Sequence, residues 1–150
     1  MLGGYTSEEI NSLLARKLKV SSEWLWQIFV NDCRSVNVSV QTLIDLATLK
    51  DRFKVILLTD NMDCFSRFTV PSLNLEHYFD RIINSHNKKR SKKDMLPDLV
   101  DGKLTKESFI IDDSSKVCNL FQELGGIACL ITTERNIDHY ISCIKTKLGI

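Results

Sequence analysis

The sequence lacks any long apolar run. Its longest runs, at 55–58 and 127–131, are four and five residues, whereas a membrane-spanning helix needs about twenty. The N-terminal residues also lack the basic start and apolar stretch of a secretory signal, so none is expected. Net charge is nearly absent, because 20 Lys and Arg oppose 19 Asp and Glu. We therefore expect a cytoplasmic protein whose partners include neither a membrane nor nucleic acid.

Paired cysteines are lacking as well. The five cysteines are widely and irregularly spaced, and no two form a CxxC pair. A disulfide framework or a zinc knuckle needs paired spacing, so neither is expected. Three of the cysteines stand among apolar residues, where a free thiol packs as a small hydrophobic group. We expect all five to be reduced and structural.

Repeats, low-complexity segments and clustered prolines are missing too. The 150 residues, 43% of them hydrophobic and 26% charged, have the composition of one ordinary globular domain. Neither of the two prolines, Pro71 and Pro97, interrupts an apolar run. A disordered tail and a fibrous repeat are therefore excluded.

The first fifty residues contain only helical patterns. Thr6 and Glu9 form a capping box, followed by apolar residues that recur on one helical face. Two more helices follow, each preceded by residues able to cap it: Ser21 or Ser22, and Asn37 or Ser39. The simplest interpretation of these apolar faces is core packing.

From residue 52 on, short apolar runs alternate with helical patterns. The runs lie at 53–58, 81–85, 109–111 and 127–131, and the helix after the third run is stopped by Gly125 and Gly126. This alternation predicts an α/β fold with a parallel, Rossmann-like sheet of about four strands and helices on both faces. The helical segment 1–51 precedes it.

Polar side chains follow the predicted strands: Thr59-Asp60-Asn61, Ser85, Asp112-Asp113 and Thr132-Thr133. Ligands collect at the carboxyl ends of parallel strands. A hydroxyl with free backbone amides suits a phosphate oxygen, and two adjacent carboxylates suit Mg²⁺. Between them, segment 88–93 carries five positive charges in six positions, most of which we interpret as a solvated loop.

The order of these features resembles the haloacid dehalogenase (HAD) superfamily, whose members are mostly Mg²⁺-dependent phosphatases. Segment 54–61 is similar to the family's second motif, and 75–85 to the stretch that leads to its third. The family's spacing after Ser85 selects Lys92 as the third-motif lysine, although Lys93 replaces the usual proline. Segment 109–114 is similar to the fourth motif.

The resemblance implies a site for phosphate or a small phosphorylated molecule, with a weakly held Mg²⁺ as cofactor. It assigns phosphate binding to Thr59, Asp60, Asn61 and Lys92, and metal binding to Asp112 and Asp113. It also implies two domains. Residues 1–51 resemble part of the helical cap of the family's first subclass, and 52–150 resemble the Rossmann-like core without its first strand.

The family's first motif is missing. That motif is a strand ending in Asp-x-Asp, which supplies the nucleophile and the general acid/base. The first aspartate of this chain, Asp32, falls in a predicted helix. Asp98 and Asp101 are three positions apart rather than two, follow no apolar strand, and are interpreted as part of a turn. No catalytic residue is therefore expected.

The leading hypothesis is a HAD-like protein of phosphohydrolase ancestry that retains a phosphate and Mg²⁺ half-site and is inactive as this chain. Two alternatives remain: a non-catalytic interaction or regulatory module that uses the 88–93 loop, and a C-terminal fragment of an active phosphatase. Without a central strand, segments 55–58 and 109–111 are expected to pair directly, or else to accept a segment of a second copy. A homodimer would also cover apolar faces around Leu13, Trp26 and Phe29.

Overall fold

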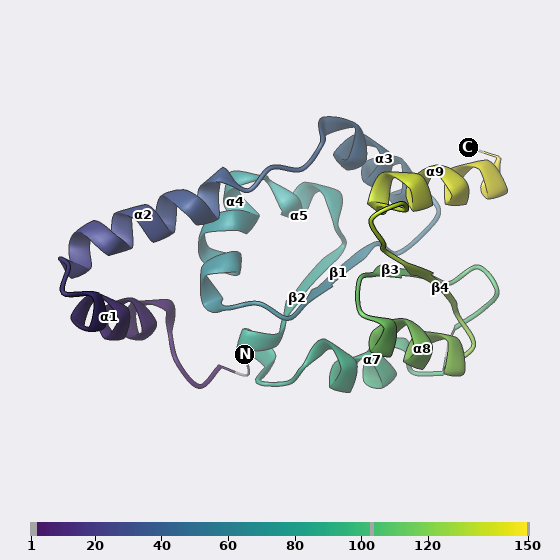
Figure 1. The fold of residues 1–150 in the computed structure, drawn as a ribbon. Helices are drawn as coiled ribbons and strands as arrows, with labels where there is room; N and C mark the ends of the chain where they lie inside the picture. Colours follow the sequence, from purple (N-terminus) through teal and green to yellow (C-terminus); the bar gives the residue numbers. More distant parts are fainter. Residues whose placement is uncertain (1–2, 103, 150) are drawn as a thin grey trace. The chain divides into compact units, whose positions relative to one another are not determined.

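The computed structural model describes residues 3–102 and 104–149. It contains short parallel strands between helices, so the predicted α/β class is confirmed (Figure 1). The chain divides into two compact units, one ending at Ser91 and the other beginning at Lys92. The boundary predicted from the family, between residues 51 and 52, stays a prediction.

Three helices open the first unit: α1 (Ser7–Leu18), α2 (Ser22–Ser35) and α3 (Val40–Lys50). The expected caps are confirmed. The Thr6 hydroxyl accepts a hydrogen bond from the Glu9 amide, and the Glu9 carboxylate accepts one from the Thr6 amide. The Ser21 and Ser39 hydroxyls cap the other two helices by accepting hydrogen bonds from the amides of Trp24 and Thr42. Among the described residues, no helix combines the length and apolarity needed to cross a membrane.

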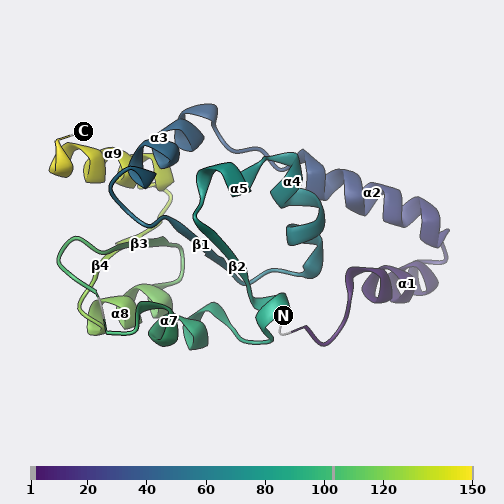
Figure 2. The ribbon, with the colours of Figure 1, turned by 180° about the vertical axis from the view of Figure 1, so that it is seen from behind.

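The first sheet pairs β1 (Ile56–Thr59) with β2 (Arg81–Asn84) in parallel. Between these strands the chain forms a π-helix, η1 (Phe65–Thr69), and two short helices, α4 (Val70–Ser72) and α5 (Leu75–Tyr78); the short α6 (Ser85–Lys88) follows β2 (Figure 2). The core of this unit is built around three buried residues: Leu43, Val70 and Leu75. The apolar β1 residue Leu57 packs against them, which holds β1 against α3 and α5.

The second unit contains α7 (Lys92–Val100), β3 (Phe109–Asp112), α8 (Ser115–Glu123), β4 (Ile127–Leu130) and α9 (Ile137–Leu148). Strands β3 and β4 pair in parallel. Glycine is required at the turn between α8 and β4, because a Cβ on Gly126 would overlap the ring of Phe121. The predicted stop of this helix at Gly125 and Gly126 is confirmed.

One expectation about this part of the chain is corrected. Segment 98–105 was expected to be a turn, but its first residues complete helix α7, because the buried Met95 and Leu96 anchor that helix in spite of Pro97. Each strand pairs with the next strand along the chain, β1 with β2 and β3 with β4, which gives two sheets of two strands in the described residues. The direct pairing of 55–58 with 109–111 would join the two units, and it stays a prediction.

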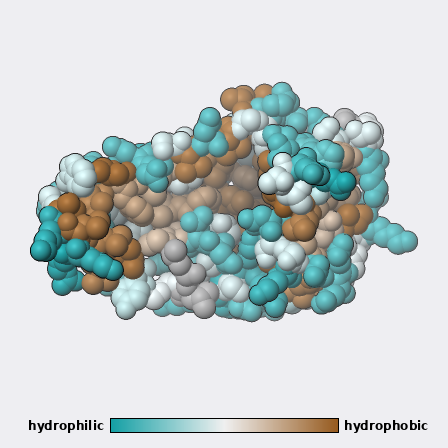
Figure 3. Space-filling view, viewed as in Figure 1, coloured by the Kyte–Doolittle hydropathy of each residue, from teal (hydrophilic) through white to brown (hydrophobic). Residues whose placement is uncertain are grey.

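The apolar residues of the helical segment were expected to lie uncovered, but only some of them are exposed. Leu13 is exposed, together with Leu14, Leu18, Trp24 and Ile28, and hydrophobic surface gathers over α1 and α2 in Figure 3. Trp26 and Phe29, however, are half-buried. Their rings stack 5.6 Å apart, and Trp26 meets the ring of Phe68 edge-on at 5.8 Å. The expectation that these two aromatic residues lie uncovered is therefore wrong, and the homodimer stays a prediction.

Candidate functional site

The loop after β1 carries the predicted phosphate ligands Thr59, Asp60 and Asn61. The Asn61 side-chain amide donates to the Thr59 hydroxyl at 3.5 Å, and the Ser85 hydroxyl donates to the Asn61 carbonyl at 3.5 Å. Ser85 is fully buried at the end of β2. The structure therefore brings Thr59, Asn61 and Ser85 together at the carboxyl end of the β1–β2 sheet, as the sequence predicts.

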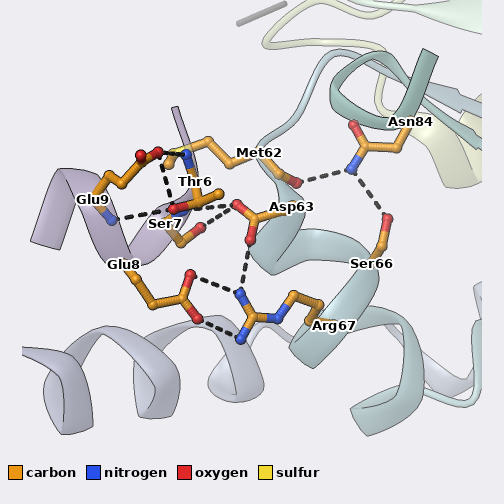
Figure 4. Close-up of polar contacts among 9 residues, drawn as sticks. All are labelled: Thr6, Ser7, Glu8, Glu9, Met62, Asp63, Ser66, Arg67 and Asn84. Carbon is orange, nitrogen blue, oxygen red and sulfur yellow. Dashed lines mark hydrogen bonds and ion pairs between the residues drawn. The ribbon is translucent and has the colours of Figure 1, made fainter. Parts of the chain in front are cut away.

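Asn84 anchors the next part of this loop, a role that the sequence analysis did not identify. Its buried side-chain amide donates to the Met62 carbonyl at 2.8 Å and to the Ser66 hydroxyl at 3.1 Å (Figure 4). Because Asn84 ends β2, these bonds tie the loop that follows β1 to the neighbouring strand. The only signal for this role in the sequence is that a polar amide directly follows the apolar residues of a predicted strand.

A network around Asp63 joins this loop to helix α1. Its carboxylate accepts from the Ser7 amide at 2.9 Å, from the Ser7 hydroxyl at 2.5 Å and from the Arg67 guanidinium at 2.8 Å (Figure 4). Arg67 also makes a two-pronged contact with Glu8, at 2.6 and 2.9 Å. The Arg67 guanidinium thus connects the π-helix η1 to the first turn of α1. Through Asp63, helix α1 also contacts the loop that carries Thr59.

The charges of this network stabilise one another. Burial acts to raise the pKa of Asp63, but the hydrogen bonds from Ser7 and Arg67 outweigh it, so that this pKa lies below its ordinary value. The hydrogen bond from Arg67 lowers the pKa of Glu8, and the two carboxylates together raise the pKa of the Arg67 guanidinium. All three groups are therefore charged at neutral pH.

A second cluster lies in the other unit, where α7 begins and β3 ends. The Lys92 ammonium contacts both oxygens of Asp112, at 2.9 and 2.8 Å, and one oxygen of Asp113 at 3.9 Å. The Ser114 amide donates to Asp112 at 2.8 Å. The side chains of Lys92 and Asp112 are 17% and 10% exposed, whereas that of Asp113 is 80% exposed. The structure therefore brings the predicted lysine and the predicted metal carboxylates together.

The donor set of this cluster fits a weakly held Mg²⁺ only in part. Mg²⁺ in proteins is held by one or two carboxylates and keeps several waters. Asp113 offers such a carboxylate to solvent, but both oxygens of Asp112 are engaged by Lys92. No group of three or more His, Cys, Asp or Glu that could hold a metal ion occurs in the described part of the chain. Any Mg²⁺ here would therefore rest mainly on Asp113.

The cysteines are free, and two of them differ in role. Cys118 is buried below Asp112, and its thiol donates to the Asp112 carbonyl at 3.6 Å. Burial, with the nearby Asp112 charge, raises the pKa of Cys118, so it packs as a neutral thiol. Cys143 on α9 is exposed instead. The expectation of structural cysteines therefore fits Cys118 but not Cys143.

Comparisons with known proteins identify the fold. No family model matches the chain, and no curated protein matches it. A HAD family enzyme from Bacteroides thetaiotaomicron is 21% identical, with a TM-score of 0.72 over 92% of this chain and 73% of that chain. A variant of that enzyme, in complex with magnesium and inorganic phosphate, gives a TM-score of 0.73 over 93% of this chain and 74% of its own.

A HAD-like family hydrolase from Porphyromonas gingivalis is also similar, with 18% identity and a TM-score of 0.70 over 99% of this chain and 76% of that chain. The similarity to these structural neighbours extends over nearly the whole chain. The chain has the fold of the HAD-like enzymes, as its sequence motifs imply.

Proposed function

We propose that this chain is a HAD-like phosphate-binding protein of phosphohydrolase ancestry that does not hydrolyse phosphate esters by itself. The observation that carries the proposal is the half-buried Lys92 ammonium held between Asp112 and Asp113 where β3 ends. A lysine in this place can offer its charge to a phosphate oxygen. The structural neighbour in complex with magnesium and inorganic phosphate supports phosphate as the ligand class.

Phosphate would compete with Asp112 for Lys92. Since the ammonium already contacts both oxygens of Asp112, a bound phosphate must share or replace part of that ion pair. We therefore expect weak binding, with a Kd near 1 mM, or about −4 kcal/mol. Thr59 would add its hydroxyl, and Asp60 and Asn61 their backbone amides. That these groups and Lys92 contact the same phosphate stays a prediction.

Mg²⁺ would be held through Asp113, with Asp112 fixing Lys92. When bound, Mg²⁺ would offset the negative charge of the phosphate oxygens. The role of the residues of the second unit is then to bind and orient: Lys92 by its charge and Asp113 by its exposed carboxylate. This assigns Asp112 a positioning role in place of direct metal binding.

The proposal of inactivity rests on the missing nucleophile. The family's covalent step needs an aspartate that ends the first strand, and the resemblance assigns no residue of this chain to that position. An assay with a generic aryl phosphate and Mg²⁺ should show no turnover above background. Robust hydrolysis that Asp113→Asn abolishes would overturn this part of the proposal and favour an active phosphatase.

Binding is tested separately by thermal unfolding of the full chain in inorganic phosphate and MgCl₂. Phosphate should raise the Tm, and Lys92→Met should remove the increase. Lys93→Met is the matched control, because Lys93 is the next residue and is exposed. Equal effects of the two substitutions would mean general charge screening and would refute a site at Lys92. Stable binding of a protein partner without any phosphate effect would favour an interaction module.

A further inference from the structure

An imidazole and a thiol face each other on the C-terminal helix, far in sequence from the residues of the proposed phosphate site. His139 and Cys143 are one helical turn apart on α9, and the Nε2 atom of His139 lies 3.7 Å from Sγ of Cys143. Both side chains are exposed. Imidazole nitrogen and thiolate sulfur are the ligands that Zn²⁺ prefers in proteins.

The distance between the two donor atoms matches a shared metal. With Zn–N and Zn–S bonds of about 2.0–2.1 and 2.3 Å, a tetrahedral angle at the metal places nitrogen and sulfur about 3.6 Å apart. The observed separation of 3.7 Å is within about 0.1 Å of this value. Small side-chain rotations would direct both lone pairs at one ion, without any movement of the backbone.

The His139 backbone is fixed by the cap of α9, and its ring contacts one neighbouring ring. Asn136 caps α9 by accepting a hydrogen bond from the His139 amide at 3.0 Å. The His139 ring packs edge-on against Tyr140 with centroids 5.3 Å apart, and the Tyr140 hydroxyl donates to the Leu130 carbonyl of β4 at 2.7 Å. The contact with Tyr140 limits the rotation of the His139 ring, so less entropy is lost when it binds a metal.

One chain supplies only two ligands, whereas Zn²⁺ prefers four. The described residues contain no group of three or more His, Cys, Asp or Glu that could complete the site. The exposed face around the pair includes Ser142 and Thr146. These small side chains would let the same face of a second helix approach closely. The nearby Lys147 ammonium lies over the Phe109 ring, 5.4 Å from its centroid.

We propose that His139 and Cys143 form a Zn²⁺ site that two copies of this chain complete as a tetrahedral pair of histidines and cysteines. Each thiol loses its proton to the buffer when it binds, so two thiols and one Zn²⁺ give a neutral bis-thiolate complex and two released protons. No oxidant is needed. The site is independent of the proposed phosphate site, and it identifies a second copy as the partner.

The test uses the full, reduced chain and Co²⁺ as a spectroscopic substitute for Zn²⁺. Co²⁺ should produce a thiolate charge-transfer band and tetrahedral d–d bands that saturate at one metal per two chains, and Zn²⁺ should displace it. Sedimentation should show the mass double with either metal and return to that of a monomer with EDTA. Cys143→Ser and His139→Asn should each weaken binding by more than about 10-fold.

Matched controls separate a site from general affinity for metals. Cys33→Ser removes a half-buried thiol of α2, in the other unit, and should leave the spectrum unchanged. His77→Asn removes an exposed histidine that also packs edge-on against the next tyrosine, 4.9 Å away, but has no cysteine one turn later. A spectrum without the thiolate band, equal losses in the controls, or one metal per chain with no change in mass would each overturn the proposal.

Discussion

Replacing Asp63 by alanine should strongly destabilise the first unit. The change removes the acceptor of three hydrogen bonds, two from Ser7 and one from Arg67. Ser7 is only 1% exposed, so its amide and hydroxyl would be left without an acceptor, at about 1–3 kcal/mol each. The ion pair with the partly exposed Arg67 adds less than about 1 kcal/mol. We expect the free energy of unfolding to fall by about 3–5 kcal/mol.

Asp63→Asn is the informative companion. An amide oxygen can still accept the Ser7 hydrogen bonds, whereas the charge that pairs with Arg67 is lost. The expected loss is therefore about 1–2 kcal/mol. Asp32→Asn makes the same change at an exposed position of α2 and should alter stability by less than about 0.5 kcal/mol.

Urea unfolding followed by tryptophan fluorescence measures these differences, because Trp26 packs against Phe68 and Arg67 beside the network. The pH dependence gives an independent check. The pKa values of Asp63 and Glu8 lie below their ordinary values of 3.8 and 4.5. The stabilisation is therefore fully present above those ordinary values and is lost as the pH falls through the lowered ones.

Asp63→Asn should accordingly flatten the acid limb of the stability curve, since one of the two carboxylates no longer titrates. Equal losses for the alanine and asparagine variants would refute the assignment to the Ser7 hydrogen bonds. A loss below about 1 kcal/mol for Asp63→Ala would show that water replaces the carboxylate, and would refute the reasoning as a whole.

Three further predictions concern the second unit. Ser114→Ala removes the cap of α8 and should cost about 1 kcal/mol in urea unfolding, while Ser114→Asn, which can still cap, should cost less. Gly126→Ala should cost about 1–3 kcal/mol, because the new Cβ meets the Phe121 ring; an unchanged Tm would contradict this packing. Tyr140→Phe should cost about 1 kcal/mol by losing the bond to Leu130, and circular dichroism should show α9 still formed.

The helix boundaries could be predicted because the signals that set them are local. Thr6 and Glu9 are three positions apart, and their reciprocal hydrogen bonds follow from that spacing. The contact between Ser7 and Asp63 spans 56 positions. No periodicity encodes it, since either residue could equally well cap a helix or face solvent.

The candidate site was predictable to a different extent in each unit. Lys92 was selected by the spacing of a family motif, and the structure indeed places it against Asp112 and Asp113. That both oxygens of Asp112 are taken by this lysine could not be anticipated, because composition does not distinguish a metal ligand from an ion-pair partner. The pairing of 55–58 with 109–111 stays a prediction, because these segments lie in different units and each strand shows only its pairing with the next strand along the chain.

The division of the strands into two local pairs has a consequence for how the chain folds. Ile56 and its partner Arg81 are 25 positions apart, and Phe109 and its partner Ile127 are 18 apart. Closing a loop costs entropy, and this cost grows with the length of the loop. Strands that are close in the sequence therefore pair faster than strands that are distant in the sequence. Each pair of strands can therefore form during synthesis, as soon as its second strand and the segment that connects the two strands have been made.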